Sequence, residues 1–331
     1  MKIALITPLY KEDYLTNTVI DGLSALKGDG AGNEIRYSSD YKSYLDITSW
    51  YAEKDDFISF AKSADVIIFC NGKGNTDYDT AEKIGRWDKT VFVDGSELGR
   101  NRRYDMDIRN KVIKGTYDGE GAIDKEMLAR CKSYFRREKP YMGGIIPLPF
   151  GIERRYISNY DPHTKKDIDI VCVFGQEEYP NLRREVRKLV ENANGLRTVT
   201  KNTNGSLFSR MMGLAPKDNG RVKFYDLLSR AKVGVSVGGG GYDTARFWEI
   251  LGNNCILLTE KLDIYEPGSR ALDYERIWQF GNLEEFESQL DKLSNFLKSD
   301  YKTSNMSEEY VRILREHSTK ARVLTILDSM A

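Results

Sequence analysis

The chain has 331 residues, of which 40% are apolar and 30% charged, a composition that suits a globular enzyme with room for two domains and excludes a disordered or fibrous chain. Lysine plus arginine and aspartate plus glutamate each number 50, so the formal net charge is zero and no global field would gather nucleic acid or a membrane surface. Since His163 and His317 are the only histidines, a histidine triad or a site with several histidine ligands is disfavoured.

Two further features of the sequence bear on the location of the protein and on the role of its cysteines. No apolar run approaches the roughly 20 residues that cross a bilayer, and the strand pattern begins at Lys2 with no signal-peptide layout. We therefore expect a cytoplasmic protein without a membrane span. The four cysteines are widely spaced and three of them lie in apolar runs, so neither disulfides nor a zinc cluster are expected.

The first half of the chain alternates short apolar runs with helix-like stretches, which is typical of βαβ units and a parallel sheet. The expected strands are residues 2–7, 64–70 and 90–93, and the expected helices include residues 56–63 and 79–87. Such strands are buried on both faces and therefore read as continuous apolar runs.

A second series of the same kind follows the polar segment 158–166. The expected strands are residues 169–174, 233–237 and 255–259, the expected helices are 182–192, 222–231 and 244–251, and two amphipathic helices, 283–297 and 307–329, end the chain. The pattern predicts an α/β protein with two Rossmann-like, doubly wound parallel-sheet domains facing a cleft. We place them at residues 1–155 and 156–306, with the helix of about 307–331 packing back on the first.

Ligands in open α/β sheets bind beyond the carboxyl ends of the strands, so the turns that follow the strands are candidate sites. The most distinctive of these turns, here named the glycine turn, consists of Gly238, Gly239, Gly240 and Gly241. It removes every side chain and leads into a helix start, where backbone N–H groups favour an anion such as a diphosphate. The alternative is a tight corner without a ligand.

The residues after the glycine turn extend this candidate donor site. Asp243 or Thr244 is the expected N-cap, and we assign both, with Tyr242, to donor binding; the Asp243 carboxylate should turn onto helix amides. Arg246 lies in the first helical turn, where it could contact a phosphate, and Glu249 lies one turn further, where it could accept hydrogen bonds from ribose hydroxyls. Alternatively, these last two form only a surface ion pair.

Here the sequence resembles a known family. Residues 244–251 (TARFWEIL) and 253–259 (NNCILLT) resemble the R-F-x-E-A-L-x-x-G-x-x-x-x-T block of group 1-type glycosyltransferases, including the spore-maturation-protein-like branch. Scattered blocks extend the resemblance: residues 133–138 (SYFRRE), 147–152 (PLPFGI), 174–175 (FG) and 180–183 (PNLR). The resemblance implies the GT-B fold and the transfer of a sugar, with a hexose expected, from a nucleotide-diphosphate donor.

The resemblance also implies roles for particular residues. Glu249 falls where the family binds the donor ribose, and Arg246 falls near the diphosphate. Two positions depart from the family. The second acidic residue, eight positions before the ribose-binding one, is Gly241 here, and the glycine after the E-A-L block is Asn253 or Asn254. The first departure bears on contacts to the sugar itself.

Other candidates follow neighbouring strands. Gly175 and Gln176 come directly after an expected strand, and Arg183 on the next helix could reach the donor phosphates or lie on a solvated helix face. Asp94 and Glu97 follow the strand 90–93 and could accept the proton of an acceptor hydroxyl, or could belong to a simple turn.

Two residues are assigned to the acceptor side. Tyr10 follows the first strand, and Arg136, beside Arg137, either lines the cleft or belongs to a charged helix end. With Asp94 and Glu97, Arg246 completes the set of candidate catalytic residues.

The chemistry expected is displacement at the anomeric carbon. The leaving diphosphate would be stabilised by the amides of the glycine turn, the helix start and Arg246, so no metal and no cofactor besides the donor co-substrate is expected. Three Asp-x-Asp triplets, at residues 77–79, 105–107 and 167–169, do not follow apolar strands as a metal-binding triplet should. Many members of the resembled group retain the anomeric configuration, and we expect the same here.

The acceptor remains open. A glycan, lipid-linked or protein hydroxyl is what the family implies. A hydroxymethylated base in DNA is an alternative that would use local clusters such as residues 100–103 (RNRR), against the neutral net charge. A third interpretation is a non-catalytic module that binds a nucleotide sugar. It follows from Gly241, which stands where the family has its second acidic residue.

Overall fold

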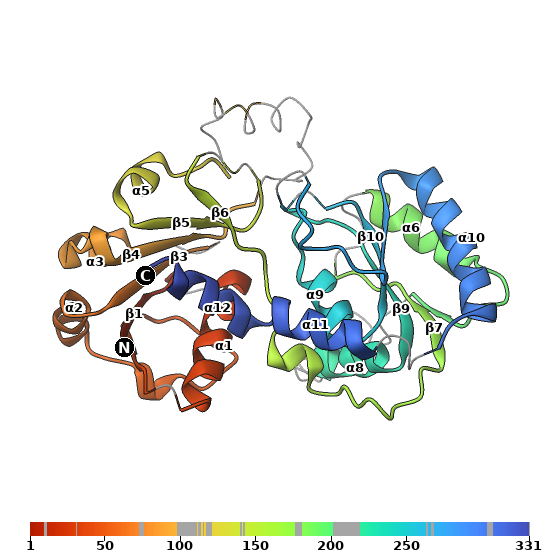
Figure 1. Ribbon diagram of the computed structural model, residues 1–331, viewed down its shortest axis with the longest axis horizontal. Helices are drawn as coiled ribbons and strands as arrows, with labels where there is room; N and C mark the ends of the chain where they lie inside the picture. The colour runs from red at the N-terminus through yellow and green to blue at the C-terminus, as the bar shows by residue number, and fades with distance from the viewer. Residues whose placement is uncertain are drawn as a thin grey trace, which may run out of the picture.

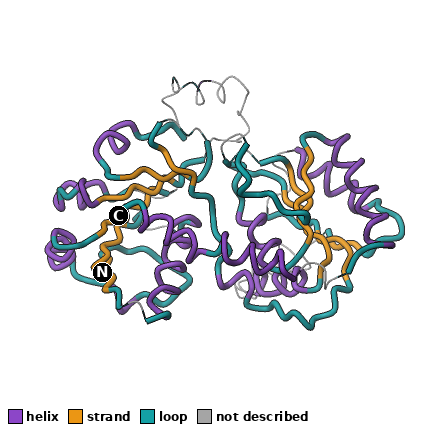
Figure 2. Tube along the Cα trace, viewed as in Figure 1, coloured by secondary structure: helices purple, strands orange, loops and turns teal. Residues whose placement is uncertain are grey.

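The computed structural model describes residues 1–9, 12–30, 32–72, 76–97, 111, 114, 116, 121–139, 141, 143–175, 181–200, 219–262, 264–265, 268–302 and 307–330. These residues form two parallel β-sheets, each flanked by helices (Figure 1). Figure 2 shows the strands of each sheet lying between layers of helices. Among the described helices, none has an apolar stretch of the length needed to span a bilayer.

The first sheet has six strands in the order β2-β1-β3-β4-β5-β6 within the described residues, and every neighbouring pair is parallel. The strands are β1 (Lys2–Ile6), β2 (Glu34–Tyr37), β3 (Val66–Asn71), β4 (Thr90–Asp94), β5 (Ser133–Arg136) and β6 (Ile145–Pro147). The helices around them are α1 (Tyr14–Gly28), α2 (Lys54–Lys62), α3 (Tyr78–Ile84) and α5 (Lys125–Arg130), with short 3-10 turns η1 (Thr48–Trp50) and η2 (Trp87–Lys89).

The second sheet has five strands in the order β11-β10-β9-β7-β8 within the described residues, again all parallel. The strands are β7 (Ile168–Val171), β8 (Thr198–Val199), β9 (Ala231–Ser236), β10 (Ile256–Glu260) and β11 (Ile277–Phe280). The helices are α6 (Asn181–Glu191), α8 (Asn219–Ser229), α9 (Ala245–Gly252), α10 (Leu283–Ser299), α11 (Ser307–His317) and α12 (Thr319–Asp328), and η3 (Arg154–Ile157) lies in the connection between the sheets.

The end of the chain returns to the first sheet. Helix α12 packs along α1, where Thr319 Oγ1 donates to Asp21 Oδ2 at 2.6 Å. Gly22 lies against this contact, because a Cβ there would be 2.3 Å from the carbonyl oxygen of Thr319. Helix α11 contacts α9 of the second sheet, so α11 and α12 together join the two halves (Figure 1).

The predicted fold class is confirmed, with corrections in detail. The single helix expected over residues 307–329 is two helices, because Ser318 is extended and its hydroxyl accepts the N–H of Ala321 as the N-cap of α12. Arg136, considered with Arg137 as a charged helix end, is the last residue of strand β5 instead. Tyr134 and Phe135 are both buried, because the two faces of that strand are covered.

Candidate active site

The glycine turn lies at the carboxyl end of β9, beneath side chains from both halves of the molecule. A Cβ on Gly240 would lie 2.1 Å from Glu97 Oε2, and one on Gly241 would lie 2.4 Å from Glu138 Oε1. A Cβ on Gly239 would lie 2.6 Å from Arg183 Nη2. Since Cβ atoms do not approach other atoms so closely, these positions admit only glycine while the charged side chains stay in place.

Carboxylates accept N–H groups in the glycine turn and directly after it. Glu260, at the end of β10, accepts the N–H of Gly238 at 2.9 Å. Glu138, which follows β5, accepts the N–H of Tyr242 at 2.6 Å and that of Asp243 at 3.4 Å. The backbone here therefore contacts the protein's own carboxylate oxygens, at the N–H groups that lead into a helix start.

The Asp243 carboxylate differs from the expectation. Its two oxygens accept the backbone N–H of Phe150 and the indole N–H of Trp248, each at 2.8 Å, rather than the amides of α9. Thr244 is the N-cap of α9 and makes no capping hydrogen bond; its hydroxyl lies 3.2 Å from Ser236 Oγ. Burial raises the pKa of Asp243 to about 6, although the nearby Arg137 lowers it.

Arg137, named from the sequence only beside Arg136, lies at the centre of this site, whereas Glu138 and Glu260 were not singled out. The Arg137 guanidinium is buried and lies 3.1 Å from Glu97, 3.7 Å from Glu138 and 4.0 Å from Asp243. We name these four residues the charged cluster. Burial lowers the pKa of Arg137, but the three carboxylates together raise it above its ordinary value. One cation thus faces three acids beside the glycine turn.

Arg136 and Asp94 form a separate buried ion pair. The parallel register of β4 and β5 sets them side by side, and Arg136 donates to Asp94 Oδ2. Tyr134 donates to the same oxygen at 2.7 Å, and Arg136 also donates to the carbonyl oxygen of Glu138 at 2.8 Å. Of the two candidate bases, Asp94 at the end of β4 and Glu97 after it, Glu97 is the one whose carboxylate lies against the glycine turn.

Arg246 and Glu249 lie together on α9. Their charged groups are 3.0 Å apart and their side chains are 20% and 13% exposed, so the pair is largely shielded from water. The Arg246 guanidinium stacks 3.6 Å above the ring of Phe224, and Tyr225 donates to Glu249 Oε1 at 3.3 Å. Both contacts are made to α8.

Of the remaining predicted residues, Arg183 and Gly175 lie near the ends of strands in the second sheet. Arg183 on α6 donates to the carbonyl oxygen of Val237, directly before the glycine turn, at 3.1 Å. Gly175 is exposed and follows β7 closely. Tyr10 and Gln176 lie outside the described residues, as do the basic cluster 100–103 and the triplet 105–107.

The Asp-x-Asp triplets that the structure describes have other partners. Asp77 caps α3 by accepting the N–H of Thr80 at 3.1 Å. Asp167 binds Arg230 at 2.8 Å, and Asp169 binds Lys232 at 2.7 Å. Within the described ranges, no group of three or more acidic, histidine or cysteine side chains has the arrangement to hold a metal ion.

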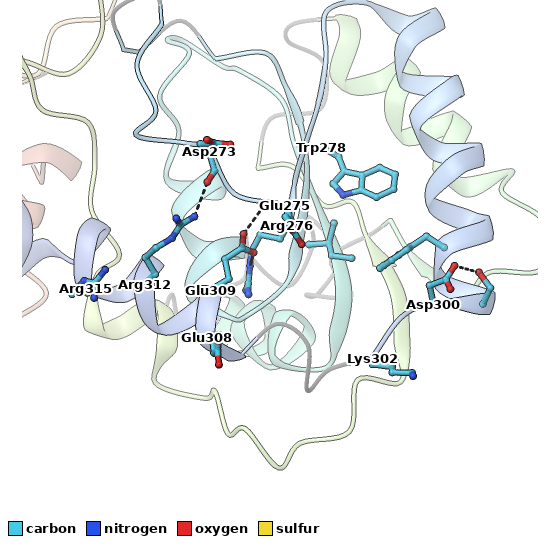
Figure 3. Close-up of a pocket in the computed structure, with 13 residues that line it drawn as sticks. Asp273, Glu275, Arg276, Trp278, Asp300, Lys302, Glu308, Glu309, Arg312 and Arg315 are labelled. Carbon is cyan, nitrogen blue, oxygen red and sulfur yellow. Dashed lines mark hydrogen bonds and ion pairs between the residues drawn. The ribbon is translucent and has the colours of Figure 1, made fainter.

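A large pocket lies away from the glycine turn. It has a volume of about 1140 Å³ and is lined by residues of β11, α10 and α11, with Trp278 and Arg276 among them (Figure 3). Its charged groups bind one another: Arg276 Nε lies 2.7 Å from Glu309, and Arg312 donates to the carbonyl oxygen of Asp273 at 2.7 Å. The pocket contains none of the predicted site residues.

No protein-family model matches the chain, and no curated protein sequence matches it. Solved structures resemble it along almost its whole length. An α-glucosyltransferase in complex with UDP-glucose and DNA containing an abasic site is 10% identical, with a TM-score of 0.60 over 99% of this chain and 98% of that one. A glycosyltransferase from Rickettsia africae is 9% identical, with a TM-score of 0.60 over 99% and 97%.

A third structure, HepE from Anabaena in complex with UDP and glucose, is 8% identical, with a TM-score of 0.51 over 100% of this chain and 99% of that one. At such identities the likeness concerns the path of the backbone. The two parallel sheets and their helices match these structures, and the chain therefore has the GT-B fold.

Proposed function

We propose that this protein is a glycosyltransferase that moves a sugar, most simply a hexose, from a nucleotide-diphosphate donor to a hydroxyl acceptor. Two independent features support the proposal. The fold resembles that of glycosyltransferases bound to UDP-glucose or UDP. The segment 244–259 resembles the donor-binding block of group 1-type glycosyltransferases, on which we base the assignment to the spore-maturation-protein-like branch.

The observation that carries the proposal is the chemistry of the glycine turn. In the turn and directly after it, the N–H groups of Gly238 and Tyr242 donate to carboxylate oxygens of Glu260 and Glu138, and these contacts support an anion-binding role for this backbone. A leaving diphosphate would be stabilised by the same groups, by the start of α9 and by Arg246, without a metal ion. Glu249, one turn further, would bind the donor ribose.

The candidates for acid and base catalysis lie at the end of β4 and directly after it. Glu97 lies against Gly240 and keeps 22% of its side chain exposed, so we assign it the contact with the acceptor hydroxyl. Asp94 is buried and bound to Arg136 and Tyr134, so we assign it to positioning β5. We expect the anomeric configuration to be retained, in line with many members of the resembled family.

The acceptor class has two candidates. A glycan, lipid-linked or protein hydroxyl follows from the resemblance to group 1-type enzymes. A modified base in DNA is favoured by one specific observation, the match to an α-glucosyltransferase in complex with UDP-glucose and DNA. Transfer to a duplex that contains hydroxymethylated bases, measured at low and high salt, separates the two, because phosphate contacts weaken steeply as salt rises.

The test of donor binding is a thermal-shift screen with UDP-, GDP-, ADP-, CMP- and dTDP-linked compounds. At least one should stabilise the protein clearly, since a ligand at 100 times its dissociation constant adds about 2.7 kcal/mol. No shift with any of them would contradict the proposal. Slow donor hydrolysis in the wild type that is lost in Glu249→Ala identifies an enzyme, whereas binding without hydrolysis or transfer identifies a binding module.

A further inference from the structure

We propose that Glu138 controls donor binding by occupying the place at the glycine turn that the donor diphosphate takes. This inference rests on the function proposed above and adds a residue to it. Glu138 follows β5 of the first sheet, whereas the glycine turn follows β9 of the second. The Glu138 side chain therefore connects the two halves at the backbone N–H groups where the donor is expected.

The contacts of Glu138 are those of a bound anion. The residue is fully buried, and Oε2 accepts the N–H groups of Tyr242 and Asp243 at 2.6 and 3.4 Å. Its other oxygen, Oε1, lies 2.4 Å from the position of a Cβ on Gly241. A phosphate oxygen that approached the same N–H groups would have to occupy the space that this carboxylate fills.

Charge makes joint occupancy unfavourable. The charged cluster sets Glu97, Glu138 and Asp243 around Arg137, so the acids already outnumber the cation. A diphosphate would add at least two negative charges within a few ångströms, and like charges at such distances repel one another, most strongly in a site that is shielded from water. The Glu138 carboxylate must therefore move away as the diphosphate arrives.

Arg137 lies where its guanidinium can bind the incoming diphosphate. Within the described residues, its Nε and Nη2 are buried and make no hydrogen bond of good geometry, although carboxylates lie at ion-pair distance. When Glu138 leaves the turn, these donors become available to phosphate oxygens. The exchange replaces one carboxylate by the diphosphate at the same N–H groups and at the same guanidinium.

Titration calorimetry with UDP on the full chain tests the inference. Glu138→Gln removes the charge and keeps the shape, while Glu138→Asp keeps the charge but draws the carboxylate back from the turn by one methylene. Both variants should bind UDP about tenfold more tightly than the wild type, because losing one repulsive contact of roughly 1.4 kcal/mol changes an equilibrium constant tenfold. Glu287→Gln, which removes an exposed charge on α10, is the matched control and should bind like the wild type.

The outcomes are distinguishable. Wild-type binding with unchanged or weaker binding by whichever Glu138 variant folds overturns this inference and leaves the proposed function standing. If neither the wild type nor any variant binds UDP, GDP or ADP, the proposed function fails and this inference fails with it. Circular dichroism and thermal unfolding of each variant without ligand establish that it is folded, and the Glu138 variants should unfold at lower temperature because a contact between the two halves is lost.

Discussion

Asp243 Oδ2 accepts the backbone N–H of Phe150 at 2.8 Å and so fixes the end of the glycine turn to the segment that connects the two sheets. The carbonyl oxygen of Phe150 is bound in turn by Arg322 of α12 at 3.2 Å. The other Asp243 oxygen holds the indole of Trp248 on α9. The position of the candidate donor site is thereby tied to both the connection and the end of the chain.

Removing the Asp243 carboxylate should destabilise the protein. Asp243→Ala leaves the buried N–H groups of Phe150 and Trp248 without partners, and each such group costs about 1–3 kcal/mol. We expect urea denaturation to show a loss of about 3 kcal/mol in the free energy of unfolding. Asp291→Ala, at an exposed position of α10, should change it by less than about 0.5 kcal/mol. Equal values for the two variants would refute this role of Asp243.

Asp94 should prove important for stability through its bond to Arg136. Asp94→Asn leaves a buried guanidinium uncompensated and should cost about 3 kcal/mol of unfolding free energy. The double variant Asp94→Asn/Arg136→Met should recover part of that loss, because no charge remains buried. Chemical denaturation of the wild type and the two variants measures both effects. An Asp94→Asn protein of unchanged stability that loses turnover alone would instead assign Asp94 to catalysis.

The contribution of His317 to stability should fall as the pH falls below about 6.5. Burial and the charge of Arg322 lower the pKa of His317 from 6.5 to about 3, and its Nε2 lies 3.0 Å from the carbonyl oxygen of Ala271. Between these values the unfolded chain binds a proton that the folded protein does not, so folding loses about 2 kcal/mol between pH 7 and pH 5.

The His317 contribution is isolated by the difference between the wild type and His317→Gln, with His163→Gln at an exposed position as control. The difference is needed because burial raises the pKa of Glu153 to about 7, and a raised carboxyl pKa changes stability in the opposite direction over the same range. A pH profile that is the same in His317→Gln and the wild type would contradict the assignment.

Glu249 should matter for nucleotide binding far more than for folding. Glu249→Gln removes a charge from the predicted ribose contact, and a hydrogen bond to a charged group contributes about 1.5–3 kcal/mol, so nucleotide affinity should fall about tenfold or more. The ion pair with Arg246 is an i,i+3 pair, which stabilises a helix by only about 0.2–0.5 kcal/mol. Calorimetry and thermal unfolding measure the two effects, with Glu185→Gln on α6 as control. Unaltered affinity would show that Glu249 does not contribute to nucleotide binding.

The sequence predicts the fold well where local patterns decide it. Strands β3, β4, β9 and β10 contain short apolar runs, which are typical of strands buried in a parallel sheet. Short strands such as β2 and β8 are partly exposed, and their sequences lack such a run. The break at Ser318 was missed because the apolar spacing continues across it while the hydroxyl caps α12.

The candidate site is predictable only in part, because half of it depends on how the two sheets pack. The glycine turn, Arg246 and Glu249 lie within one segment and were found together. Glu138 reaches Tyr242 across 104 residues, and no local pattern reports such a contact. The sequence feature that could have indicated Glu138 is the charged run of residues 136–138. It lies at the carboxyl end of β5, next to Asp94 on β4.

Hydrogen–deuterium exchange with and without a saturating nucleotide sugar tests most directly whether residues 238–249 hold the donor. The account predicts slower exchange in peptides that cover residues 238–249 and little change in those that cover residues 273–279, which line the pocket of Figure 3. Unchanged exchange at residues 238–249 in a protein shown to bind the nucleotide sugar, or protection confined to the pocket, would contradict it.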